Sequence, residues 1–186
     1  MGSDDAELIA RWQRGEVAAF EGLVRRWQQP VARFIFRLVG RVEPVNDLCQ
    51  EVFLRVYQAG GRYRERGRFS TWLYRVALNV VRDYARRRGG RTASLNHLEL
   101  IDRGPAADRL CQQEESDRLV ARAVAELPES MRTALVLRHY EQMSFEEMSR
   151  LLGTPASTLK SRFAGALQQL RARLQDLGLG PEEDER

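Results

Sequence analysis

The sequence has only two cysteines, two histidines and a single lysine. Cys49 and Cys111 lie far apart and form no CxxC spacing, which argues against a disulfide framework or a zinc site and favours reduced thiols. We expect Cys49 to be a small core residue, with a redox sensor as the alternative. His97 and His139 are isolated, so surface or capping roles are expected for them instead of catalysis.

Long apolar runs are also absent. No stretch of 18 apolar residues occurs, and the start of the chain lacks a basic segment followed by an apolar one. We therefore expect a cytoplasmic protein that does not insert into membranes. The sequence contains no P-loop, no HExxH and no nucleophile elbow. No enzymatic activity, metal, cofactor or small-molecule substrate is expected.

Charge is plentiful but unevenly placed. The chain of 186 residues has a net charge of +4 and room for one ordinary domain or two small ones. Residues 1–92 hold 18 arginines against 10 acids, a net charge of +8, whereas 93–127 carry −3 and 128–186 carry −1. A positive N-terminal half indicates an acidic partner there. Arginine suits phosphate binding, although a GC-rich genome would give the same arginine bias.

Apolar spacing predicts three helices in the first 60 residues. Asp4 and Glu7 are spaced as a capping box for the first helix, and Pro30 should kink or restart the second. The expected landmarks are Gly15 and Gly40, which end the first two helices, and Asp47, which begins the third after a turn containing Pro44 and packs Leu48, Val52 and Val56 inward.

A fourth helix, predicted to follow the loop 63–70 and to include residues 73–86, has one apolar and one polar side. The polar side offers donors to phosphates and base edges, which its own core does not need. The apolar stripe comprises Leu73, Val76, Ala77, Val80 and Tyr84, and the polar face comprises Arg75, Asn79, Arg82 and Arg86.

Aromatic and cationic residues alternate just before this helix. Such a mixture can stack unpaired bases and hold a phosphate backbone, which suggests strand opening as well as duplex binding. The rings are Tyr63, Phe69 and Trp72, and the cations are Arg62, Arg64, Arg66 and Arg68.

The stretch from Asp47 to Arg88 resembles the second conserved region of bacterial sigma factors of the extracytoplasmic-function group. The matching residues are Asp47, Leu48, Gln50, Glu51, Val52, Phe53, Leu54, Phe69, Thr71, Trp72, Leu73, Tyr74, Arg75, Ala77, Asn79 and Asp83, ahead of Arg86, Arg87 and Arg88. From spacing alone the polar residues after Asp47 could be a solvated face. The resemblance implies that they dock on the clamp helices of the largest subunit of RNA polymerase, through Asp47, Gln50, Glu51 and Leu54. It also implies minus-ten DNA binding and melting through Tyr63, Arg66, Phe69, Trp72, Arg75, Asn79, Arg82 and Arg86.

Periodicity is weak after Arg88, and glycine, serine and proline are frequent up to Pro105. Residues 91–114 are therefore expected to form a flexible linker between two domains. The resemblance implies that this segment threads through the polymerase. At the other end of the chain, 178–186 is expected to be an acidic, disordered tail.

The C-terminal third has the pattern of a helix-turn-helix, which is a short helix, a glycine turn and a longer helix. Ser144 and Glu147 make a capping box for the short helix, and Gly153 ends it. Thr154 is expected to cap the next helix and Pro155 to occupy its first position. The last helix is expected to bury Leu159, Phe163, Leu167, Leu170 and Leu174.

A recognition helix needs short polar residues near its N-terminus to approach the major groove, together with cations for phosphate. The run from Leu127 through Arg162 resembles the fourth conserved region of sigma factors, which recognises the minus-thirty-five element. Ser157 stands where the family often has glycine, and Gly165 and Leu167 stand where arginines are common. These departures are expected to affect how tightly the domain binds the minus-thirty-five element. The implied DNA-binding residues are Ser157, Thr158, Lys160, Ser161 and Arg162.

These observations predict an all-α protein with two small helical domains, 1–90 and 115–177. The expected function is that of a sigma factor, with core RNA polymerase, promoter DNA and an anti-sigma factor as partners. Two alternatives remain: a sigma-like decoy that sequesters an anti-sigma regulator, and a free-standing helix-turn-helix regulator. A decoy would not need the cationic aromatic loop, and a free-standing regulator would leave the +8 half unexplained.

Overall fold

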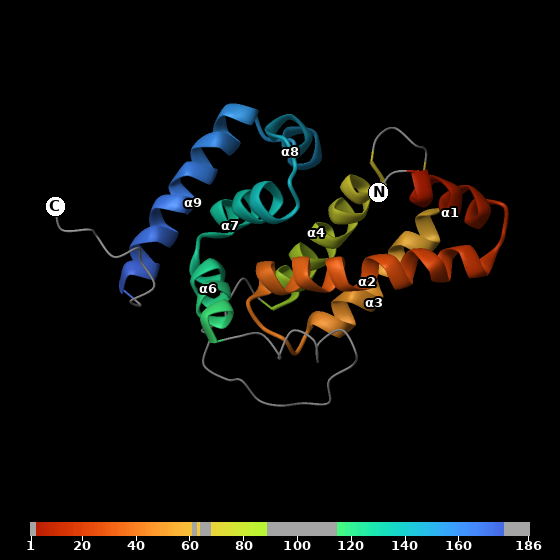
Figure 1. The fold of residues 1–186 in the computed structure, drawn as a ribbon, viewed down its shortest axis with the longest axis horizontal. Coiled ribbons are helices and arrows are strands. Elements are labelled where there is room, and N and C mark those ends of the chain that lie inside the picture. Colours follow the sequence, from red (N-terminus) through yellow and green to blue (C-terminus); the bar gives the residue numbers. More distant parts are fainter. Residues whose placement is uncertain (1–2, 61–62, 64–67, 89–114, 177–186) are drawn as a thin grey trace. The chain divides into compact units, whose positions relative to one another are not determined.

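The computed structural model describes residues 3–60, 63, 68–88 and 115–176 (Figure 1). The chain forms two units: Met1–Phe36 with Arg41–Cys111, and Gln112–Arg186 with the four residues Arg37–Gly40. Every regular element within the described ranges is helical, which confirms the predicted all-α fold with two small helical domains. The predicted linker over 91–114 and the predicted tail over 178–186 lie outside the described residues.

Helices α1 (Ser3–Gln13) and α2 (Val17–Val39) open the first unit. Gly15, at φ 97°, and Gly40, at φ 75°, follow them as predicted and adopt left-handed backbone that glycine tolerates best. The predicted capping box is wrong, because α1 begins at Ser3 and Asp4 therefore lies inside the helix. The predicted restart at Pro30 is also wrong, since α2 continues through it.

The burial of side chains on both sides of Pro30 explains why α2 continues through this proline. Proline removes one backbone hydrogen bond and crowds the preceding turn. Leu23 and Trp27 before Pro30, and Phe34 and Ile35 after it, are all buried. Burial of each such side chain contributes about 1.5–3 kcal/mol. The apolar face shared by both halves outweighs the local cost of the proline.

Helix α3 (Val45–Ala59) begins two residues earlier than predicted, with Pro44 in the N-cap position. Leu48, Val52 and Val56 are buried, as predicted. Helix α4 (Phe69–Arg87) packs against α3 and buries Leu73, Ala77 and Val80 completely. Its buried stripe differs from the predicted one, because Val76 and Tyr84 are only half-buried. It also includes Tyr74, whose ring lies 4.7 Å from that of Phe34, and Leu78.

The second unit contains α6 (Glu115–Glu126), α7 (Glu129–Leu135) and a π-helical turn, η2 (Val136–Tyr140). Arg132 of α7 is buried, and its Nε and Nη2 donate to the carbonyl oxygen of Leu127 at 3.3 and 3.0 Å. Desolvation lowers the pKa of Arg132 from its ordinary value. The chain continues from α7 directly into the π-helical turn.

Helices α8 (Phe145–Leu152) and α9 (Ala156–Asp176) form the helix-turn-helix (Figure 1). The predicted capping box is confirmed: the Glu147 amide donates to Ser144 Oγ at 3.1 Å and the Ser144 amide to Glu147 Oε2 at 2.8 Å. Gly153, at φ 64°, ends α8 as predicted. Helix α9 begins at Ala156, so Pro155 precedes the helix instead of occupying its first position.

The buried stripe of α9 is narrower than predicted, because Phe163, Leu170 and Leu174 are only half-buried. Leu159 and Ala166 are buried, whereas Leu167 is 43% exposed. At about 100° per residue, Ala166 lies about 20° from Leu159 around the helix axis and Leu167 about 80° from it. The prediction stepped four residues from Phe163 to Leu167, whereas the buried residue lies three residues after Phe163, at Ala166.

Candidate nucleic-acid interface

Helix α4 presents a polar face whose side chains extend away from the core of the first unit. Arg75, Asn79, Arg82 and Arg86 are all exposed, while Leu73 and its neighbours on the opposite side are buried. Steps of four, three and four residues bring the four side chains to one side of the helix. Three cations and one amide on a single face can bind phosphates and one base edge.

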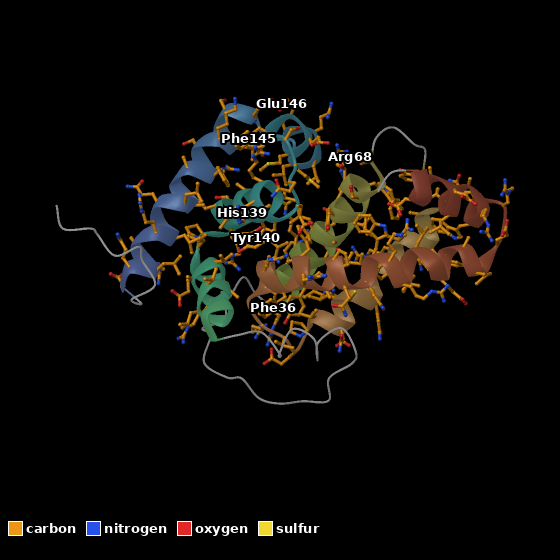
Figure 2. All side chains as sticks on the ribbon, viewed as in Figure 1. Phe36, Arg68, His139, Tyr140, Phe145 and Glu146 are labelled. Carbon is orange, nitrogen blue, oxygen red and sulfur yellow. The ribbon has the colours of Figure 1, made fainter. Side chains whose placement is uncertain are left out.

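Arg68 directly precedes this helix (Figure 2). Three aromatic rings gather at the start of the helix. The centroid of Tyr63 lies 4.7 Å from that of Trp72 and 5.8 Å from that of Phe69. Tyr63 and Trp72 are half-buried, whereas Phe69 is only 6% exposed and also packs against Trp27. Tyr63 and Trp72 therefore offer ring surface, and Phe69 supports them from beneath. Arg66, a predicted site residue, lies outside the described residues.

Gln13 connects α1 to this region through hydrogen bonds that were not predicted from the sequence. Its Nε2 donates to the carbonyl oxygens of Gly60 at 3.1 Å and Tyr63 at 2.8 Å. Gly60 leaves room for the Trp12 indole, because a Cβ there would lie 1.9 Å from the ring. Contacts across about fifty residues leave no periodic signal, so sequence spacing could not reveal them.

Helix α3 carries the predicted docking residues. Asp47 and Gln50 are exposed, and Leu54 is 51% exposed. Glu51 is half-buried because it accepts a hydrogen bond from Arg55 Nε at 2.7 Å. Tyr57, one turn beyond Leu54, is 50% exposed although its ring lies 5.1 Å from that of Phe20. Sequence reasoning missed Tyr57, whose spacing from Leu54 would have marked it.

The start of α9 exposes the short polar residues of the second predicted DNA surface. Ser157, Lys160 and Ser161 are exposed, and Thr158 and Arg162 lie half-buried at the edges of that face. Leu159 between them is fully buried and fixes the orientation of the helix. The five residues therefore share one accessible side of α9.

Phe145 at the start of α8 supports the lysine on this face (Figure 2). Lys160 Nζ lies 5.8 Å from the centroid of the Phe145 ring, and the Arg138 guanidinium lies 5.3 Å from the same centroid. Phe163 of α9 meets this ring edge-on. Cations within about 6 Å of an aromatic face are attracted to it. Phe145 is not among the site residues predicted from the sequence.

Cys49 lies in the core of the first unit, as predicted. Burial raises the pKa of its thiol to about 12, and Sγ lies 3.7 Å from the carbonyl oxygen of Gln28. A thiol that stays protonated at neutral pH is a weak nucleophile and a weak metal ligand.

Metal-ligating residues do not cluster within the described ranges: no three His, Cys, Asp or Glu side chains there could share an ion. In this part of the chain no helix is long and apolar enough to cross a membrane.

Two family models match the chain. Sigma-70 region 2 matches residues 23–91, and sigma-70 region 4 matches residues 117–170. The first match covers α3 and α4 with the aromatic cluster, and the second covers the helix-turn-helix. Each predicted DNA surface therefore lies inside one matched region.

Similar proteins match over nearly the whole chain. The RNA polymerase sigma-H factor of Pseudomonas aeruginosa is 32% identical over 93% of this chain and 95% of its own length. The ECF RNA polymerase sigma-E factor of Escherichia coli K12 is 33% identical with the same coverage. Among solved structures, CnrH in complex with the cytosolic domain of CnrY superposes with a TM-score of 0.68 at 26% identity, covering 94% of this chain and 99% of that one.

Proposed function

Because the chain belongs to the extracytoplasmic-function group of the sigma-70 family, we propose that it binds core RNA polymerase and directs promoter-specific initiation. In this proposal it recognises the minus-thirty-five element as duplex and the minus-ten element as melted single strand. It acts in the cytoplasm, where the polymerase is, and performs no catalysis of its own.

The observation that carries the proposal is the polar face of α4 beside two accessible rings. Tyr63 and Trp72 can stack bases of the non-template strand, Asn79 offers a donor and an acceptor to one base, and Arg82 can hold phosphate. Unstacking a base costs a few kcal/mol, and a base stacked on an aromatic ring returns about 1–3 kcal/mol. Binding energy alone can therefore drive local melting.

Residues 115–177 form the domain for the minus-thirty-five element in this proposal. The N-terminal turns of α9 enter the major groove, where Ser157 and Ser161 approach base edges. Lys160 and Arg162 neutralise phosphates, and Thr158 contributes at the edge of the same face. Residues 91–114 link this domain to residues 1–90.

Docking on the polymerase is assigned to α3. Asp47, Gln50 and Glu51 supply polar contacts, and Leu54 supplies exposed apolar surface at their side. An apolar residue ringed by polar ones is a common composition at protein interfaces. The partner surface in this proposal is the pair of clamp helices of the largest subunit.

We also propose an anti-sigma factor as a regulatory partner. The similar protein CnrH was solved in complex with the cytosolic domain of CnrY. A regulator that covered the docking residues of α3 or the polar face of α4 would compete with polymerase or promoter.

Run-off transcription tests the proposal. Purified core polymerase is incubated with a library of promoter fragments, with and without the protein. Transcripts that appear only when the protein is present are the expected result, and their aligned start regions give both elements. Absence of transcripts and of polymerase binding would favour the sigma-like decoy. Promoter binding as a dimer without polymerase would favour the free-standing regulator.

A further inference from the structure

Asp83 lies among arginines on α4, the helix that is proposed to bind DNA. Its neighbours along α4 are Arg82, Arg86 and Arg87, and Arg88 directly follows the helix. A carboxylate beside a phosphate-binding face repels the phosphate backbone unless its charge is offset. We therefore expect a nearby cation that offsets the negative charge of Asp83.

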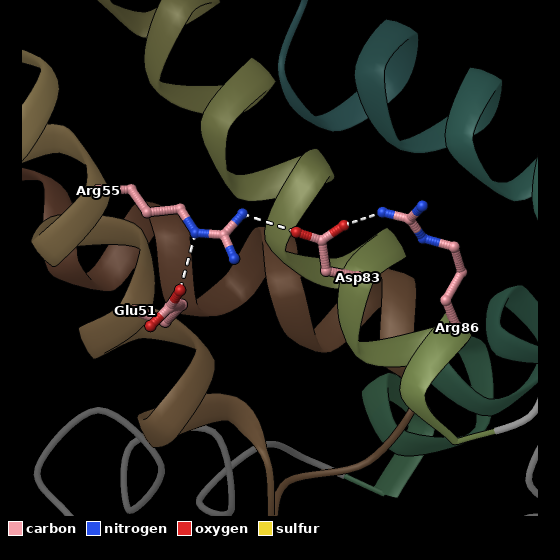
Figure 3. Close-up of polar contacts among 4 residues, drawn as sticks. All are labelled: Glu51, Arg55, Asp83 and Arg86. Carbon is pink, nitrogen blue, oxygen red and sulfur yellow. Dashed lines mark hydrogen bonds and ion pairs between the residues drawn. The ribbon is translucent and has the colours of Figure 1, made fainter.

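Both oxygens of Asp83 are already engaged (Figure 3). Oδ2 accepts from Arg55 Nη1 of α3 at 2.8 Å, and Oδ1 accepts from Arg86 Nη2 of its own helix. The hydrogen bonds from Arg55 and then Arg86 hold the pKa of Asp83 below its ordinary value. Asp83 is therefore ionised at neutral pH, and Arg55 is the cation that reaches it from another helix.

Arg55 uses a second donor in the opposite direction. Its Nε donates to Glu51 Oε1 at 2.7 Å, so one planar guanidinium contacts a carboxylate at each side (Figure 3). Arg55 is about one third exposed and Asp83 slightly less, whereas Arg86 is 79% exposed. Only arginine offers several donors in a fixed plane, because a lysine ammonium acts as a point charge.

We propose that Arg55 is a positioning residue for both interfaces: it holds Glu51 toward the polymerase and neutralises Asp83 beside the DNA-binding face of α4. The proposal rests on the proposed function, in which Glu51 docks and Arg86 binds phosphate. The pairing of Glu51, Arg55, Asp83 and Arg86 balances two negative and two positive charges. Loss of Arg55 leaves two carboxylates without their shared partner.

Four variants of the full-length protein separate the two roles: Arg55→Gln, Arg55→Lys, Asp83→Asn and the double variant Arg55→Gln with Asp83→Asn. Arg25→Gln is the matched control, since Arg25 belongs to an exposed ion pair with Glu21 on α2. The dissociation constant for core polymerase is measured first. Promoter affinity is then measured with polymerase in excess over a range of salt, and thermal unfolding is followed by circular dichroism.

Arg55→Gln is expected to weaken polymerase binding and promoter binding, each by about three- to tenfold. Arg55→Lys keeps the charge, so promoter affinity stays within about twofold of the unmodified protein while polymerase binding weakens. The decisive result comes from the Asp83→Asn background. There Arg55→Gln still weakens polymerase binding but no longer weakens promoter binding, because no acid is left to neutralise.

Three results would overturn the assignment. These are unchanged binding by Arg55→Gln, equal loss at both interfaces in the Asp83→Asn background, or losses that only follow a lower melting temperature. If Arg55→Gln does not fold, Arg55→Lys decides, since the split between polymerase and promoter affinity must appear there. Failure of the unmodified protein to bind polymerase would instead refute the proposed function.

Discussion

Asn79 and Arg86 share the exposed face of α4 but differ in what they can recognise. A side-chain amide presents one donor and one acceptor group, so it can distinguish base edges. A guanidinium donates to any phosphate regardless of sequence. Asn79 should therefore contribute to sequence preference, and Arg86 to affinity for DNA of any sequence.

We predict that Asn79→Ala changes sequence preference, at a cost of about 1–3 kcal/mol on the matched minus-ten element and little on mismatched ones. Arg86→Ala should weaken binding to all promoters alike and lower the salt slope by about 1. Competition binding of the polymerase complex to matched and mismatched fragments measures both. Equal losses for Asn79→Ala on both kinds of fragment would remove its assignment to a base.

Cys49 yields a prediction about pH. Because its pKa is raised to about 12, the thiolate needed for alkylation is scarce in the folded protein until the pH nears that value. Iodoacetamide at pH 8 should therefore leave the Cys49 peptide unmodified in native protein and modify it fully in denaturant. Mass spectrometry of the digested peptides measures the fraction of Cys49 that is alkylated. Rapid native labelling would restore the redox-sensor alternative.

Among the elements, the turn between α8 and α9 depends on one backbone conformation. Gly153 lies at φ 64°, and a Cβ added there would meet nothing within 4 Å. A substitution therefore suffers only backbone strain, about 1–2 kcal/mol for Ala. Gly153→Ala should lower the free energy of unfolding of the second unit by that amount.

Gly153→Asn is the matched comparison, because asparagine tolerates left-handed backbone better than alanine. Chemical denaturation of the two variants should place Asn between wild type and Ala. If Ala and Asn destabilise equally, strain at this residue is not the cause.

Sequence reasoning succeeded where the signal is local. The capping box of Ser144 and Glu147 and the glycine turn at Gly153 each depend on residues within one or two helical turns, and the structure has both. It failed at Leu167, where a one-residue error in the step moved the expected stripe by about 100° around the helix axis. The bond from Arg55 to Asp83 joins two residues that are 28 positions apart on different helices, and such pairing has no periodic signature.

At the scale of the whole molecule, each unit has its own core. Phe34, Ile35 and Leu73 are fully buried in the first, and Leu135 and Met148 in the second. A separate core is the physical requirement for independent folding. The domain boundaries at 90 and 115 stay a prediction.

Fragments 1–90 and 115–177 should each fold alone, with helical circular dichroism and a cooperative thermal transition. The smaller C-terminal fragment should melt at the lower temperature, because a shorter chain buries a smaller share of its surface. An unfolded fragment alongside a folded full-length chain would show that its core needs the other unit.

The single lysine of the chain makes amine-modifying reagents selective for one side chain. Lys160 is the only lysine of the chain, and it is exposed on the predicted DNA face of α9 above the Phe145 ring. Reagents that modify primary amines have one side-chain target, apart from the amino terminus. Acetylation of the free protein should thus erase one positive charge at one known place, and promoter DNA should shield that amine from the reagent. A single residue thereby serves as a built-in footprinting probe for contact with the minus-thirty-five element.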